Sequence, residues 1–332
     1  MKKSLSIVIP NYNGRELLEK NLPSVFIAAK ASQCLFEVII SDDCSTDSSI
    51  AFIKETYPSI ILVENKFNQG FSGNINSGIR KAKNDLVLLL NSDIVLTENY
   101  IQPLLPYFEI ENTFGVMGRI IAIDSDEVQD TAKYPSFNIF SGLKGTINYV
   151  VIPQDNQIAG GKNLSLFLSG ANALVDREKL LEIGMFQKLF NPFYWEDVEL
   201  GIKAWRMNYH CYYEDSAICR HPASTTIGKY HKKSKVSIIS RRNKILFHYL
   251  HLQNLSLFLW MMNYLIKSFF RALSFDISYY KSFYLFLKQK RAASKEKETF
   301  QSLQDKRGIS IRLQDVILQL KTEIGNTPII KF

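Results

Sequence analysis

The feature that most constrains this chain is a run of five apolar residues, Leu86 to Leu90, that leads directly into Asn91, Ser92 and Asp93. A short uninterrupted apolar run predicts a strand buried on both faces, as in a parallel sheet covered by helices. A carboxylate that follows such a strand lies at the edge where open α/β sheets bind their ligands. There, Asp93 can hold a hard cation against phosphate groups. The alternative is that Asp93 only caps the turn after the strand.

Strands and helices alternate up to this point in the sequence. Apolar runs at residues 4–9, 36–40 and 60–63 predict three earlier strands, and the segments between them carry apolar residues at helical spacing. This alternation predicts an α/β fold with a doubly wound, mostly parallel sheet that is flanked by helices and joined by right-handed crossovers. Polar residues follow each predicted strand, so we expect them to line one crevice that suits a nucleotide.

Length and composition fit one large globular domain with an appendage. The chain has 332 residues, of which 46% are hydrophobic. The four cysteines have no zinc-type spacing, so we expect free thiols in a reducing compartment; they are Cys34, Cys44, Cys211 and Cys219. The basic N-terminus is followed by too short an apolar run to predict a signal peptide.

The net charge of +8 comes from one segment. Residues 241–291 contain nine Lys or Arg, a single acid (Asp276) and thirteen aromatic residues. Residues 245–266 carry no Asp, Glu, Lys or Arg, but scattered polar side chains disfavour a membrane-spanning helix. Aromatic residues among basic ones are typical of a helix that lies on an anionic membrane surface. We therefore expect this segment to lie on a membrane; packing onto the catalytic part or a homodimer contact is the alternative, and nucleic acid is not an expected partner.

Seven sequence blocks resemble, in their order, those of family 2 glycosyltransferases, and the resemblance covers residues 4 to about 228. The blocks are residues 7–13, 41–47, 68–78, 90–93, 169–171, 184–186 and 193–200. The resemblance implies the GT-A fold, a nucleotide-diphosphate sugar donor, a divalent cation (Mg²⁺ or Mn²⁺) and an inverting displacement at the anomeric carbon. It points to rhamnosyltransferase-like enzymes that build bacterial surface glycans.

The same resemblance assigns the donor side to residues at the predicted strand ends. Asp42 corresponds to a carboxylate that contacts the base, and Pro10, Asn11 and Tyr12 correspond to a shelf for the nucleoside. The other residues expected to bind the nucleotide-sugar are Gly70, Asn76, Asn91, Ser92 and Asp93.

Two residues are implied as metal ligands. Asp93 corresponds to the metal-binding position of the family's Asp-x-Asp triplet, whose first position is Asn91 here, so Asp93 is the only carboxylate of the triplet. His221 resembles a second metal ligand that is found in part of the family. The alternative for His221 is a histidine packed or hydrogen-bonded at a strand end.

The chemistry is expected at Trp195, Glu196 and Asp197. A sugar hydroxyl is a poor nucleophile, so a carboxylate must accept its proton as the new bond forms. The resemblance implies that Asp197 is this base and that Glu196, with Trp195, orients the acceptor. The alternative is that these acids only begin a helix, where negative charge favours the macrodipole. Both interpretations hold together if a helix begins there.

Two stretches do not fit the alternation. Residues 119–165 contain prolines, glycines and aromatics, and we expect a long acceptor-side loop. Residues 228–235 are basic and are either a loop that folds over the diphosphate or a solvated linker. The expected domains are a catalytic domain over residues 1–228, with a nucleotide-binding half (1–118) and an acceptor half (119–228), and a helical membrane-associated region over residues 229–332.

The leading hypothesis is an inverting glycosyltransferase that extends a surface glycan on a glycan or lipid-linked acceptor, in the cytoplasm at the inner face of the cell membrane. A catalytically silent scaffold in a membrane glycan-assembly complex is the alternative, and the presence of both Asp93 and Asp197 argues against it. A nucleotidyltransferase would need a glycine-rich basic loop directly after the first strand, and residues 11–14 lack one.

Overall fold

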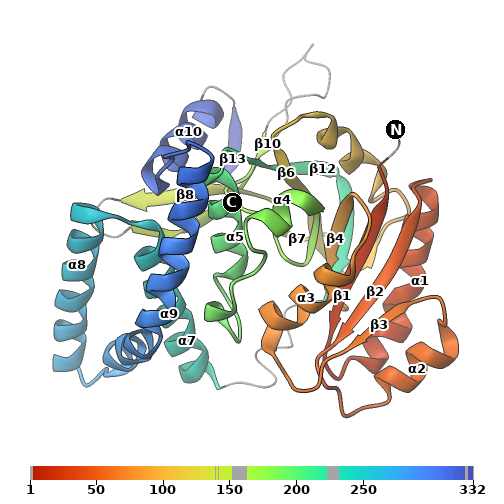
Figure 1. Cartoon of the computed structure of the whole chain (residues 1–332), viewed down its shortest axis with the longest axis horizontal. Helices are drawn as coiled ribbons and strands as arrows, with labels where there is room; N and C mark the ends of the chain where they lie inside the picture. The colour runs from red at the N-terminus through yellow and green to blue at the C-terminus, as the bar shows by residue number, and fades with distance from the viewer. Residues whose placement is uncertain are drawn as a thin grey trace.

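A computed structural model describes residues 3–138, 140, 142–151, 163–222, 232–325 and 328–331. Within these residues, ten strands form one large sheet with the spatial order β10-β12-β6-β11-β4-β1-β2-β3, while β5 pairs with β12 and β7 pairs with β6 (Figure 1). In chain order its strands are β1 (Leu5–Asn11), β2 (Phe36–Asp42), β3 (Ile61–Glu64), β4 (Leu86–Leu90), β5 (Val95–Leu96), β6 (Thr113–Ala122), β7 (Val128–Asp130), β10 (Asn163–Leu164), β11 (Asn172–Asp176) and β12 (His210–His221).

The predicted mostly parallel α/β sheet is confirmed. Strand β1 runs parallel to β2 and β4, and β2 runs parallel to β3. Strand β11 is antiparallel to both β4 and β6, and β12 is parallel to β6, so β4, β6 and β12 share one direction. Because the chain moves outward through β1, β2 and β3 and then returns to β4, the topological switch lies between β1 and β4.

Strand β4 is the centre of the core, as its apolar run predicts. All five of its residues are buried, with exposures of 0–1%. It is hydrogen-bonded on both sides, with Leu86 opposite Leu5 of β1 and Leu90 opposite Asn172 of β11. Helices cover both faces of the sheet, because right-handed crossovers place α1 and α2 on one face and α3 on the other. The helices that accompany the sheet are α1 (Arg15–Ala31), α2 (Ser49–Thr56), α3 (Gly70–Lys81), α4 (Arg177–Glu182), α5 (Glu196–Arg206) and the 3₁₀ helices η1 (Gln102–Glu109) and η2 (Lys188–Phe190).

The prediction of a long acceptor-side loop over residues 119–165 is wrong for the described part of that stretch. Strands β8 (Ala132–Asn138) and β9 (Gly142–Val151) form an antiparallel hairpin, and β13 (Ile329–Lys331) adds to β9 to complete a second, three-stranded sheet. Apolar and polar residues alternate along β9, as in a half-buried strand. Pro135 is tolerated because β8 is an edge strand of this sheet. Residues 152–162 lie outside the described structure.

The C-terminal region is helical, as predicted, and packs against the rest of the chain (Figure 1). It consists of α7 (Lys233–His251), α8 (Asn254–Leu273), α9 (Ser278–Lys306) and α10 (Leu313–Gly325). Helix α7 is buried through Ile245, Leu246 and Phe247, while α8 keeps many apolar side chains exposed. Among the described residues, no helix is long and apolar enough to cross a bilayer. The domain boundary near residue 228 stays a prediction. Residues 228–231 of the predicted basic loop lie outside the described residues, whereas residues 233–235 belong to α7 and are not loop.

Candidate active site

The donor-side residues predicted from the strand ends gather at the β1/β4 switch. Asn11 ends β1 and Asp42 ends the neighbouring β2, where they lie opposite each other in the parallel register. Asn91, Ser92 and Asp93 follow β4 directly, and the Asn21 side chain of α1 donates to the carbonyl of Ser92 at 2.8 Å. The turn after β4 is therefore fastened to a helix that begins beside the end of β1.

Asp42 is buried and bonded within the protein. Its Oδ2 accepts from Asn11 Nδ2 at 2.8 Å and from the Ser45 hydroxyl at 2.6 Å, and its Oδ1 accepts from the Ser45 backbone N–H at 2.8 Å. In this conformation the carboxylate braces the ends of β1 and β2. Tyr12, by contrast, is half exposed beside Pro10, as a nucleoside shelf requires. The base-contacting role of Asp42 and the shelf stay predictions.

Gly70 and Asn76 connect α3 to neighbouring segments through hydrogen bonds. Asp43, one of the polar residues that follow the predicted strands, accepts from the backbone N–H groups of Gln69 and Gly70 at 2.8 and 2.9 Å. Gly70 has φ +70°, and a Cβ there would lie 3.0 Å from the Asn191 side chain, so glycine is required. Asn76 is buried, and its amide both donates to and accepts from the Phe186 backbone. Its direct contact with a nucleotide-sugar stays a prediction.

Asp93 and His221 meet, as the metal-site prediction requires. The strand pairing of β5 with β12 places Val95 opposite Arg220, so His221 at the end of β12 lies beside the turn after β4. The His221 Nε2 atom is 3.3 Å from Asp93 Oδ2, and both side chains are mostly buried. These two residues are 128 positions apart in the chain.

The surroundings of this pair fit a bound divalent cation. Gln129 of β7 places its Oε1 2.9 Å from His221 Nδ1, so a proton on Nδ1 leaves the Nε2 lone pair free toward Asp93. The other Asp93 oxygen, Oδ1, is buried and has no hydrogen-bond partner. No group of three or more His, Cys, Asp or Glu side chains with metal-ligand geometry occurs in the described part of the chain. A cation here would therefore take its remaining ligands from the donor phosphates and water, as Mg²⁺ and Mn²⁺ commonly do.

Trp195, Glu196 and Asp197 form the start of α5, so the expected helix start is confirmed. Tyr194 and Trp195 both have positive φ, at 70° and 75°, in a region that non-glycine residues rarely adopt. Such backbone persists only where surrounding contacts hold it. Those contacts come from α7, where the Asn243 amide donates to the carbonyls of Phe190, Phe193 and Tyr194 at 2.7–2.9 Å.

The two carboxyls at this helix start are strongly perturbed. Both residues keep partial solvent access, and one Glu196 carboxyl oxygen, Oε2, is buried without a hydrogen-bond partner. Burial, followed by the charge of Asp197, raises the pKa of Glu196 to about 8. Burial also raises the pKa of Asp197, and the nearby Lys133 ammonium opposes that shift. A buried carboxylate with a raised pKa is a better proton acceptor than an exposed one, as a general base requires.

Lys133 of β8 reaches this carboxyl pair from the smaller sheet. It forms an ion pair with Asp130 and donates to Asn148 Oδ1 at 2.8 Å. Burial lowers the pKa of Lys133 to about 8, so its positive charge is largely retained near neutral pH.

Sequence reasoning missed Gln129, Lys133 and Asn243. Gln129 and Lys133 fall inside the stretch that was interpreted as a loop, and their partners His221 and Asp197 lie more than 60 residues away. Asn243 lies in a segment that was interpreted by its composition alone. No spacing signal in the sequence distinguishes any of the three.

Solved structures share this fold. The chain superposes on S. aureus TarS residues 1–349 in complex with UDP-GlcNAc, with a TM-score of 0.55 and 14% identity, covering 93% of each chain. It also superposes on mannosyltransferase PcManGT from Pyrobaculum calidifontis in complex with GDP-Man and Mn²⁺, with a TM-score of 0.52 and 13% identity, covering 98% of this chain and 86% of that one. The fold is therefore that of the GT-A glycosyltransferases.

The sequence model described as Glycosyl transferase family 2 matches residues 6–184. Because that is more than half of the chain, the protein belongs to this family. An uncharacterized glycosyltransferase of Nostoc sp. is 30% identical over 126 residues, 37% of this chain and 38% of that protein. Chondroitin synthase of Escherichia coli is 25% identical over 240 residues, 63% of this chain and 33% of that protein. The matches thus span little more than a third of these curated relatives.

A pH profile tests the link between Lys133 and Asp197. Replacing Lys133 with Met removes a cation that favours the ionised carboxylate, so the pKa of Asp197 should rise further. The acidic limb of the rate of sugar transfer or donor hydrolysis should then move to higher pH. The control is Lys54→Met, which removes a surface cation on α2 that pairs with Glu64. An acidic limb that stays in place in Lys133→Met would show that Lys133 does not influence the reacting base.

Proposed function

We propose that the chain is an inverting glycosyltransferase that moves a sugar from a nucleotide-diphosphate donor to a hydroxyl of a glycan or lipid-linked acceptor. The observation that carries this proposal is the meeting of Asp93 and His221 at the switch point of the sheet, with one Asp93 oxygen buried and unpartnered. The fold likeness to proteins solved with UDP-GlcNAc and with GDP-Man and Mn²⁺ supports a nucleotide-sugar donor.

On the donor side, Asp93 and His221 would hold Mg²⁺ or Mn²⁺. When bound, the cation supplies charge neutralisation for the leaving diphosphate, so no acid is needed from the protein. Asn11, Tyr12 and the turn after β4 lie where the nucleoside and the sugar would then bind. Gln129 orients His221, and the Asn21 contact with Ser92 holds the turn in place.

On the acceptor side, Asp197 is the general base. The acceptor oxygen bonds to the anomeric carbon while the bond from that carbon to the diphosphate breaks, and the hydroxyl proton goes to Asp197. Because attack comes from the face opposite the leaving group, the anomeric configuration inverts. Glu196, whose pKa of about 8 keeps it largely protonated at neutral pH, can donate a hydrogen bond to the acceptor and orient it.

Within this function we propose a rhamnosyltransferase-like role in building a bacterial surface glycan. Three relatives support a polymeric product: chondroitin synthase, poly-β-1,6-N-acetyl-D-glucosamine synthase of Staphylococcus aureus and poly(ribitol-phosphate) β-glucosyltransferase of Bacillus spizizenii. The alternative, a catalytically silent scaffold, would leave a buried carboxyl pair and a strained helix start with no function.

The exposed face of α8 supports attachment to an anionic membrane surface. Its exposed apolar residues recur at helical spacing, so they form one stripe: Leu255, Phe258, Met262, Leu265, Ile266, Phe269, Phe270 and Leu273. Lys267 and Arg271 lie on the same helix, and no acid does. Helix α8 also lies at the outer edge of the molecule (Figure 1). Apolar residues that enter the interface and cations that meet anionic lipid are the two contributions that hold such helices on membranes.

The metal site predicts that donor binding depends on Asp93. In Asp93→Ala, the Mn²⁺-dependent affinity for UDP or GDP should fall by about tenfold or more, because even loss of an outer-shell contact costs that much. Titration calorimetry with and without Mn²⁺ measures this change. Asp126→Ala, which removes an exposed carboxylate that pairs with Arg220, should bind as the wild type does. Unchanged Mn²⁺-dependent affinity in Asp93→Ala would refute the assignment.

The base assignment predicts that Asp197→Asn keeps donor and metal binding but loses turnover. The release of UDP or GDP from a screened panel of nucleotide-sugars should slow by roughly 10²–10⁴-fold, the usual contribution of a positioned general base. Glu196→Gln should slow this release less and should mainly lower the affinity for the acceptor. If Glu196→Gln abolishes turnover while Asp197→Asn retains it, the assignment is wrong by one residue. If neither substitution alters the rate, the base lies elsewhere.

Attachment through α8 predicts that the full chain binds anionic vesicles and loses this binding in Phe258→Glu/Phe269→Glu. Both side chains are more than half exposed, so the fold should be retained. Leu35→Glu, at a residue that is 78% exposed directly before β2, is the control. Vesicles of phosphatidylglycerol at low salt, sedimented with the protein, provide the measurement. A wild-type chain that ignores the vesicles but is dimeric, and becomes monomeric in the double variant, would make α8 a homodimer contact instead.

A further inference from the structure

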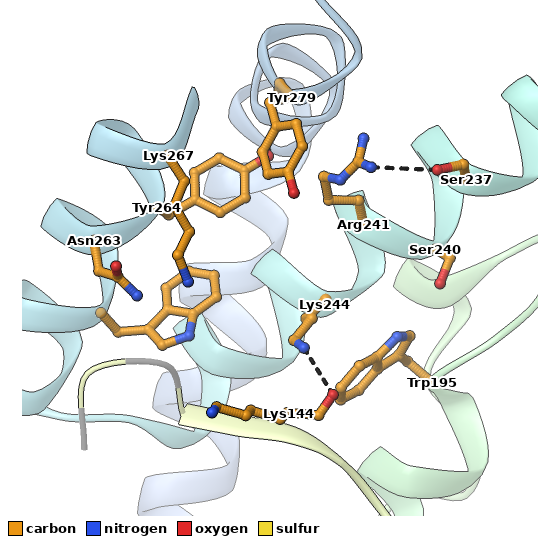
Figure 2. Close-up of a pocket in the computed structure, with 11 residues that line it drawn as sticks. Lys144, Trp195, Ser237, Ser240, Arg241, Lys244, Asn263, Tyr264, Lys267 and Tyr279 are labelled. Carbon is orange, nitrogen blue, oxygen red and sulfur yellow. Dashed lines mark hydrogen bonds between the residues drawn. The ribbon is translucent and has the colours of Figure 1, made fainter. Parts of the chain in front are cut away.

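A cavity of about 480 Å³ lies among α7, α8, β9 and the first turn of α9 (Figure 2). Its volume is within the range of sites that bind small molecules. Four cationic side chains line it and no described lining residue is acidic; the cations are Lys144, Arg241, Lys244 and Lys267. Trp195, the residue directly before the carboxyl pair, lines the same cavity. The cavity therefore places four positive charges next to the expected acceptor side of the active site.

The positive charge in this cavity is not neutralised by ion pairs within the described structure. Arg241 donates to the hydroxyls of Ser278 and Ser237 and lies 3.9 Å from the centre of the Tyr279 ring. Lys244 donates to the Lys144 carbonyl at 2.9 Å, as Figure 2 shows, and lies 5.6 Å from the centre of the Trp195 ring. Asp276, whose pKa is lowered in part by Arg241, is not among the lining residues.

Burial and the nearby positive charges of Lys267 and Lys144 lower the pKa of Lys244 to about 8. Holding cations together in this way is unfavourable unless an anion joins them. The hydrogen bonds of Arg241 and Lys244 go to neutral hydroxyls and a carbonyl, and these groups do not cancel the charge.

We propose that this cavity binds the phosphate or diphosphate group of the acceptor. The inference rests on the proposed function, and it adds the chemical class of the acceptor. This anion site is distinct from the donor site. The donor diphosphate is assigned to Asp93, and none of the described residues that line the cavity comes from the ends of β1, β2 or β4. Arg and Lys side chains are the usual partners of phosphate oxygens.

The position of the cavity indicates what is attached to that phosphate. On one side Trp195 leads to Glu196 and Asp197, where the reacting hydroxyl must lie. On the other side Lys267 and Asn263 belong to α8, next to exposed Ile266 and Met262 of its apolar stripe. A phosphorylated acceptor can thus extend its sugar toward Asp197 and its lipid toward the apolar stripe. The phosphate group is common to a lipid phosphate ester and to a free inorganic anion, and the test distinguishes these two sources.

The test measures binding to the full chain in EDTA, without donor, so that it does not depend on sugar transfer. Titration calorimetry compares farnesyl diphosphate, farnesol and inorganic pyrophosphate. Lys267→Gln changes an exposed residue and should preserve the fold, and Lys244→Gln/Lys267→Gln removes two of the four cations. The matched control is Lys290→Gln, an exposed cation of α9 outside the cavity.

Farnesyl diphosphate should bind the wild type more tightly than farnesol or pyrophosphate does. Its affinity should fall severalfold in Lys267→Gln and about tenfold or more in the double variant, while Lys290→Gln stays within about twofold. Equal binding of farnesyl diphosphate to the wild type and the double variant would overturn the site. Tighter binding of pyrophosphate than of the ester would overturn the acceptor as its source. A failed search for a nucleotide-sugar donor would contradict the proposed function but would leave this binding result intact.

Discussion

The donor side of this protein depends on one short antiparallel pairing, between β5 and β12. Strand β4 delivers Asp93 to the carboxyl edge of the sheet, but a single carboxylate in a turn is a weak cation site. The two-residue strand β5 follows the turn and pairs with the last residues of β12, so His221 comes within 3.3 Å of Asp93. Strand β12 in turn is held by its long parallel pairing with β6. The meeting of Asp93 and His221 is thus a consequence of sheet order, and changes in β6 or β12 are expected to act on the proposed metal site from a distance.

The acceptor side depends on a different part of the chain, the helices that follow residue 232. The strained backbone before α5 is held by Asn243, and the body of α5 is fastened by buried cations that donate to carbonyls. Lys203 donates to the carbonyls of Ile183 and Met185, and Arg206 donates to the carbonyl of Ile311. The C-terminal helices therefore complete the active site while α8 faces outward. This arrangement couples the position of Asp197, the proposed general base, to the surface that we propose lies on the membrane.

The fold was largely predictable from the sequence, because each early strand is a short apolar run that ends in polar residues. The run at residues 86–90 located the buried centre of the sheet, and the acids at 196 and 197 located a helix start. The hairpin of β8 and β9 was not predicted, because Pro135 and the glycines obscured its alternation. Gln129, Lys133 and Asn243 could not be found either. Their functions come from partners far away in the chain, and only the three-dimensional structure brings these residues together.

The central claim is that Asp93 and His221 hold a divalent cation together with the donor diphosphate. Pulsed electron paramagnetic resonance of Mn²⁺, in the presence of the full chain and UDP, tests it most directly. The account predicts phosphorus couplings from the nucleotide and one nitrogen coupling from a histidine, with the nitrogen signal lost in His221→Gln. Phosphorus couplings without any nitrogen coupling in the wild type would contradict it, because Mn²⁺ would then bind the donor without His221.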